Sequence, residues 1–201
     1  MPDSSDPHPH AVRYRRALVV VWVTLAVGAV ALVAFGPVEP SADGVAAALR
    51  STGPWGWAVF AGWLSLRGVL LLPSTPMLLA GAVAFADAQW TAVALAMGAV
   101  VVSAWLVYVL ADRVGLGHYL EHRFPHKLDA FRDKLDSAGG TVGVALWAAN
   151  PFVPTSLVCY AAGTAHADVR RYLLGVTVGE APLVVFYVVG GAALASRWLP
   201  V

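Results

Sequence analysis

Cysteine is almost absent from this 201-residue chain, which contains only Cys159. A single cysteine excludes an intramolecular disulfide and any metal cluster built from several cysteines. Cys159 lies in an apolar stretch, so we interpret it as a small packed residue rather than a reactive thiol.

Charged residues are also scarce. They make up 12% of the chain, against about 25% in a typical soluble domain, while 59% of the residues are hydrophobic. The net charge is only +1 and the basic residues are spread along the chain, so nothing indicates a nucleic-acid partner. This composition predicts an integral membrane protein, all-α and polytopic, located in the cell (plasma) membrane.

The first long apolar run is residues 17–35, which is long enough to cross a bilayer. Residues 1–16 precede it and are expected to be a disordered cytoplasmic tail. The run is longer than the apolar core of a signal peptide and no small-x-small cleavage site follows, so we expect an uncleaved first span. Residues 17–201 then form one membrane domain.

Two later apolar segments, 55–86 and 141–163, are interrupted by paired prolines. The first contains Pro73-Ser74-Thr75-Pro76, and the second contains Asn150-Pro151-Phe152-Val153-Pro154. Proline removes a backbone donor and clashes with the preceding turn, so each segment should break there into arms too short to cross a membrane. We therefore expect two re-entrant helical hairpins and about three full spans, at 17–35, 91–111 and about 172–194.

The positive-inside rule favours this topology. With a cytoplasmic N-terminus and two re-entrant segments, 10 of the 13 basic residues lie inside. They are Arg13, Arg15, Arg16, Arg113, Arg123, Lys127, Arg132, Lys134, Arg170 and Arg171. If the first broken segment crossed the membrane once, the basic residues of 112–140 would move outside. The same model places Trp55, Trp57, Trp90 and Trp198 together at the outer interface.

The two broken segments resemble each other. Both contain Pro-x-x-Pro, each is followed by an apolar arm that ends in glycine (Gly81 or Gly163), and an aromatic residue nine positions later (Trp90 or Tyr172) opens a span. Each span contains a further glycine, Gly98 or Gly179. In the topology above the repeats are inverted, which is typical of a transporter core. Broken backbone at membrane depth must be buried or line a wet cavity, so we expect the two breaks to face each other across one.

Several polar residues at the breaks are candidates for the substrate path. Free backbone N–H groups after each break suit an anionic headgroup. Hydroxyls are available from Ser74, Thr75, Thr155 and Ser156, although helix capping is an equally good interpretation of them. The Asn150 amide either touches ligand or bridges the loop backbone.

Arg67 and Glu180 are the ionisable residues within the membrane segments. Such residues usually face a bundle interior or a cavity. Either they form a buried ion pair that only holds helices together, or Arg67 attracts a phosphate while Glu180 exchanges protons or competes for Arg67. Pro182 is expected to bend the last span and help expose Glu180.

The chain resembles the DedA superfamily, also called the SNARE-associated Golgi protein or VTT-domain family. The resemblance is carried by LLLPSTPMLLAGAVAF (70–85), NPFVPTSLVCYAAG (150–163) and RRYLLGVTVGEAPLVVFYVVGG (170–191). The resemblance places the family core at about 40–195, and it implies a helical bundle with two oppositely inserted re-entrant hairpins that moves lipids or lipid-linked phosphates between leaflets. The chain departs from the usual pattern at Ala148, where members carry Arg, at Ser156 and Cys159, where Asp or Asn is common, and at Glu180, where an uncharged residue is usual.

Together these features predict a membrane transport protein that moves phospholipid or polyprenyl-phosphate headgroups between leaflets, as a flippase or scramblase. The alternatives are a proton- or cation-coupled carrier of a small solute, with Glu180 as the coupling site, and a non-transporting protein that organises membranes. An enzyme is not expected, because the re-entrant segments contain no His, no paired acids for a metal and no G-x-S-x-G turn. No metal or cofactor is expected. Membrane lipids are the expected partners, and a homo-oligomer is left open.

Overall fold

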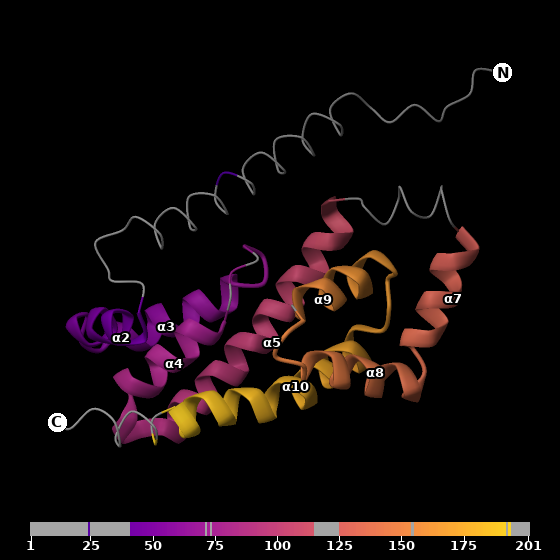
Figure 1. Ribbon diagram of the computed structural model, residues 1–201. Coiled ribbons are helices and arrows are strands. Elements are labelled where there is room, and N and C mark those ends of the chain that lie inside the picture. The colour runs from indigo at the N-terminus through magenta and orange to yellow at the C-terminus, as the bar shows by residue number, and fades with distance from the viewer. Residues whose placement is uncertain are drawn as a thin grey trace.

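The computed structural model describes Thr24 and residues 41–70, 72, 74–114, 125–153, 155–191 and 193, and within these residues it contains helices and no strand (Figure 1). The predicted N-terminal tail lies outside the described residues, as does the first span apart from Thr24. The all-helical class predicted from the sequence is confirmed for the described part of the chain.

The first half of the described chain is a short helix followed by a broken helix and a long one. Helix α2 begins after Ser41, whose hydroxyl accepts a hydrogen bond of 3.0 Å from the Gly44 N–H and so caps the helix. The elements are α2 (Ala42–Ser51), α3 (Trp55–Leu66), α4 (Thr75–Ala84), the 3₁₀ turn η1 (Ala86–Ala88) and α5 (Gln89–Val114).

The second half repeats this order. The hydroxyl of Ser137 caps α8 by accepting a hydrogen bond from the Gly140 N–H at 3.0 Å. Pro182 lies inside α10 and is followed by a π-helical turn, η2, since proline cannot donate the regular helical hydrogen bond. The elements are α7 (Pro125–Leu135), α8 (Ala138–Ala148), α9 (Thr155–Thr164), α10 (Val169–Val185) and η2 (Phe186–Gly190).

Among the described residues, two helical segments are long and apolar enough to cross a membrane, Ala86–Ala111 and Val169–Gly190. They correspond to the predicted spans at 91–111 and 172–194. Only 39% and 33% of their most apolar windows are buried inside the protein. The core helix of a soluble protein would be mostly buried, so the apolar faces of these helices are suited to lipid. The short arms α4 and α8 are also apolar, with 10 and 11 residues.

The helices pack in a pattern that relates the two halves. In each half the arm before the break packs on the long helix of the same half, α3 on α5 and α8 on α10. The arm after the break packs on the long helix of the other half, α9 on α5 and α4 on η2, which continues α10. The arm after each break is therefore exchanged between the halves, as expected for two structural repeats that share one core.

The first broken helix is a hairpin. Trp57 of α3 stacks on Phe85 just after α4, with ring centroids 3.7 Å apart, and a Cβ added at Gly81 of α4 would clash with the ring of Phe60 of α3. In each contact the two partners lie at nearly equal distances along the sequence on either side of the break, so the chain reverses there (Figure 1). The reversal brings the starts of α3 and α5 to one end of the bundle, where Trp55 and Trp90 are exposed.

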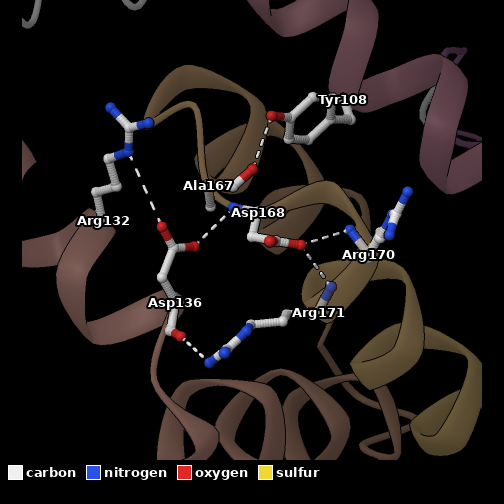
Figure 2. A network of polar contacts seen from close by, with 7 residues as sticks. All are labelled: Tyr108, Arg132, Asp136, Ala167, Asp168, Arg170 and Arg171. Carbon is white, nitrogen blue, oxygen red and sulfur yellow. Dashed lines mark hydrogen bonds and ion pairs between the residues drawn. The ribbon is translucent and has the colours of Figure 1, made fainter.

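In the second half, a polar network joins the end of α7 to the start of α10 (Figure 2). Asp136 accepts a hydrogen bond of 2.6 Å from the Asp168 N–H, and its backbone carbonyl accepts one from Arg171. The Asp168 carboxylate caps α10 by accepting from the N–H groups of Arg170 and Arg171, at 2.8 and 3.0 Å. Tyr108 of α5 donates to the carbonyl of Ala167 at 2.8 Å. The turn before α10 is thereby held to α5 and α7.

The cap at Asp168 predicts a pH dependence. The Arg171 N–H, with the Arg170 N–H, lowers the pKa of the Asp168 carboxyl. Stability from the ionised carboxylate is therefore full above the unfolded-state pKa of about 3.9 and is lost as the pH falls through the lower folded-state pKa. We expect the wild type to melt at a higher temperature than Asp168→Asn at pH 6, with a difference that shrinks below about pH 4. Thermal unfolding in detergent between pH 6 and pH 3 measures this, and a pH-independent difference would contradict it.

Candidate functional site

The first break holds Arg67 inside the protein. Arg67 directly follows α3, its N–H donates to the Trp63 carbonyl at 2.9 Å, and its own carbonyl accepts from Leu72 at 2.8 Å. These bonds continue the helical turn past the end of α3 and point the side chain into the bundle, where the residue is 9% exposed.

Gly68 lets this turn approach α5 closely. Its N–H donates to the Ser103 hydroxyl at 3.1 Å, and a Cβ at this position would lie 2.6 Å from that oxygen and 2.9 Å from Val107. Any larger residue would push the turn that carries Arg67 away from α5. Glycine is therefore required here for contact rather than for an unusual backbone angle.

The second break begins after α8. The side-chain oxygen of Asn150, Oδ1, accepts a hydrogen bond of 2.9 Å from the Phe152 N–H, which stabilises the turn. The Asn150 side chain thus bridges the loop backbone, one of its two predicted roles. Phe152, at the tip of the loop, is 92% exposed.

Glu180 of α10 meets residues from both breaks. Its Oε1 lies 3.2 Å from Arg67 Nη2 and accepts a hydrogen bond of 2.7 Å from the Thr155 hydroxyl. We call Arg67, Thr155 and Glu180 the polar cluster. The ion pair that the sequence offered as one alternative is therefore present. Glu180 is 4% exposed, so the expectation that Pro182 exposes it is wrong.

The hydrogen bonds of the polar cluster are incomplete. Within the part of the chain that the structure describes, both hydrogen bonds of the Glu180 carboxylate end on Oε1. Arg67 Nε is buried without a hydrogen-bond partner in the same part. Buried polar groups are normally satisfied, and an orphaned one in a native protein calls for water or a ligand.

The polar cluster lies on a cavity of about 400 Å³, which we call the large cavity. Residues of both breaks line it, together with the part of α10 and η2 around Glu180, Leu183 and Tyr187. The two breaks therefore share one cavity, as their sequence pattern predicts. All seven candidate residues for the substrate path line it: Arg67, Ser74, Thr75, Asn150, Thr155, Ser156 and Glu180.

A second cavity, of about 10 Å³, also adjoins the polar cluster. Arg67, Thr155, Ser156 and Glu180 line both cavities, and the small one continues to Ser103 and Cys159. Its volume is close to that of a single water site, and its walls offer several polar partners. The three residues of the polar cluster thus line both cavities.

Two of the four hydroxyls at the breaks, those of Ser74 and Thr155, are not used as helix caps. Ser74 is the N-cap residue of α4, yet its side chain makes no capping hydrogen bond. The Thr155 hydroxyl, at the first residue of α9, donates to Glu180 instead. Capping therefore does not account for either residue, and their hydroxyls belong to the cavity wall.

The predicted break residues fall into two groups. Pro73 and Pro154 lie outside the described residues, Pro76 is the second residue of α4, and Pro151 lies in the loop and lines the large cavity. Gly81 and Gly163 are packing positions rather than turning points, because a Cβ would clash with Phe60 at Gly81 and with the Tyr108 carbonyl at Gly163.

Sequence reasoning missed two residues of the site. Tyr187 lines the large cavity and Ser103 lines the small one. Both lie in apolar helices with no neighbouring break or charge. Ser103 stands out only as a buried hydroxyl, 3% exposed, in an otherwise apolar span, and its partner Gly68 is 35 residues away.

A family model described as the VTT domain matches residues 72–193, more than half of the chain. The match includes both breaks, Thr155 and Glu180, and begins five residues after Arg67. Comparisons with curated proteins and with solved structures gave no match.

Proposed function

This chain belongs to the VTT domain family, which is the DedA or SNARE-associated Golgi protein family, and from that premise we propose that it moves phospholipid or polyprenyl-phosphate headgroups between membrane leaflets, as a flippase or scramblase. The family is membrane-associated and linked to transport, and two long, mostly exposed apolar helices fit a membrane protein.

The observation that carries the proposal is the large cavity, which has residues of both breaks and a buried arginine in its wall. In a membrane, broken helices are tolerated where they line a hydrated path. A headgroup in this cavity would pass between the repeats while its acyl or prenyl chains stay in lipid.

Arg67 is the residue that we assign to the phosphate. A guanidinium binds phosphate oxygens through several N–H groups in one plane, and Nε of Arg67 has no protein partner in the described chain. Ser74, Thr75 and Ser156 add hydroxyls, and the free N–H groups at the starts of α4 and α9 add donors at the positive ends of two helix dipoles.

The proposal includes a placement in the bilayer. The hairpins α3–α4 and α8–α9 enter from opposite sides, the N-terminus is cytoplasmic, and the membrane is the plasma membrane. The basic residues Arg132, Arg170 and Arg171 lie together near the start of α10, and Trp55 and Trp90 lie at the other end of the bundle (Figure 1). This separation supports a cytoplasmic end and an outer interface.

A second candidate is a proton- or cation-coupled carrier of a small solute. The observation that favours it is the buried Glu180 carboxylate on the cavity wall, since intramembrane acids often serve coupling ions. Lipid movement without dependence on a pH gradient would exclude this coupling.

The test is reconstitution into liposomes with a fluorescent lipid labelled in one leaflet. We expect wild-type protein to accelerate transbilayer movement and Arg67→Gln to lower the rate by at least about tenfold, since a charge-assisted hydrogen bond to phosphate contributes roughly 1.5–3 kcal/mol. Arg50→Gln is the matched control, because Arg50 is exposed and lies outside the cavity, and its side chain donates to the Val83 carbonyl at 3.3 Å. Equal rates with and without wild-type protein, for phospholipids and polyprenyl phosphates alike, would refute the proposal.

A further inference from the structure

The charges on the large cavity balance each other. Among the described residues that line it, Arg67 is the one cation and Glu180 the one anion. They are 9% and 4% exposed and pair at 3.2 Å. A ligand that enters this cavity must therefore meet both charges in a poorly solvated place.

A purely anionic headgroup fits this pair badly. When a phosphate takes Arg67, it leaves the Glu180 carboxylate buried without its cation and adds a second negative charge beside it. Uncompensated charge in a site of low polarity is strongly disfavoured, and like charges repel there more than in water.

A zwitterionic headgroup exchanges partners without changing the total charge. Its phosphate replaces Glu180 at Arg67, and its ammonium replaces Arg67 at Glu180. Arg67 Nε has no hydrogen-bond partner in the described chain, which leaves the guanidinium a donor for a phosphate, and both hydrogen bonds of Glu180 to described residues end on Oε1. The Thr155 hydroxyl keeps Glu180 in place by holding Oε1.

We propose that the large cavity selects a zwitterionic ammonium phosphate, with Arg67 binding the phosphate and Glu180 the ammonium. This inference rests on the proposed function and narrows its substrate class to zwitterionic phospholipids, which disfavours the polyprenyl phosphates. Leu72, Leu78, Leu157 and Leu183 give the same cavity apolar walls that suit the glycerol and first methylenes of a lipid. The same headgroup chemistry occurs in soluble phosphoethanolamine, so the test separates the two sources.

The experiment compares two lipids labelled on an acyl chain, phosphatidylethanolamine and phosphatidylglycerol, in liposomes containing the wild-type protein. We expect the ethanolamine lipid to move faster by about tenfold or more, because a buried like-charge contact opposes the anionic lipid. In Glu180→Gln the ratio of the two rates should fall by about the same factor. Asp87→Asn is the matched control, since it removes an exposed carboxylate outside the cavity and should leave the ratio unchanged.

The outcomes separate this inference from the proposed function. If wild-type protein moves phosphatidylglycerol as fast as phosphatidylethanolamine, the inference is overturned and lipid transport still stands. A Glu180→Gln variant that slows both lipids by one factor also overturns it. If neither lipid moves but soluble phosphoethanolamine enters liposomes faster than glycerol phosphate, lipid transport fails and the zwitterion selectivity holds. The wild-type ratio needs no variant, and Glu180→Asp, which keeps the charge, should retain the preference if Glu180→Gln does not fold.

Discussion

Replacing Glu180 with alanine is expected to lower the free energy of unfolding by about 3–5 kcal/mol, because it leaves the Arg67 guanidinium buried without its partner. The measurement is thermal or denaturant unfolding in one detergent. Asp87→Ala, at an exposed position in η1, is the control and should change stability by less than about 0.5 kcal/mol.

Two double variants show what the pair does. Arg67→Met with Glu180→Leu should recover much of the lost stability, since no charge is then left unpaired. The exchange Arg67→Glu with Glu180→Arg should keep the pair but lose transport, because the phosphate-binding cation has moved from the first break to α10. Transport that survives the exchange would show that the pair only holds helices together. A loss below about 1 kcal/mol in Glu180→Ala, typical of a surface pair, would show that the pair is well solvated.

Replacing Gly179 with alanine is expected to lower the free energy of unfolding by about 1–3 kcal/mol, the usual cost of overpacking. A Cβ at Gly179 would overlap the Ala145 carbonyl oxygen and lie 2.8 Å from the Ala148 Cβ, so α10 and α8 would have to separate. Because Glu180 is the next residue, we also expect weaker contact between Glu180 and Arg67 and slower transport.

Gly98→Ala is the matched control for this prediction. Gly98 lies in the middle of α5, is exposed and has nothing within 4 Å of an added Cβ. Alanine there should be neutral or stabilise the helix by up to about 1 kcal/mol, since glycine lowers helix stability by that amount. Equal losses in both variants would contradict the close packing of α8 on α10.

The resemblance between the two halves was visible in the sequence, but the equivalence of single positions was not. Each span has a glycine near the same place, Gly98 eight residues after Trp90 and Gly179 seven after Tyr172, yet of the two only Gly179 meets a neighbouring helix. A repeat motif records where helices break and begin. It does not record which face of a helix receives a partner, because that depends on packing with segments far away in the chain.

The sequence by itself determined the helical membrane class and the places where the helices break. Both follow from local chemistry: long apolar runs suit lipid, and paired prolines cannot continue a helix. It also named the seven polar residues that line the large cavity, since polar groups in apolar segments must face something other than lipid.

Only the tertiary structure decided how these residues combine. Arg67 and Glu180 are 113 residues apart, and their pairing depends on α3 and α10 both packing on α5. The same packing turned the Thr155 hydroxyl from a helix cap to Glu180 and brought Ser103 to the turn after Arg67. Spacing along the chain fixes what one helix offers on each face. Which faces meet is decided by the close packing of all the helices at once, and that packing set the charge balance of the cavity.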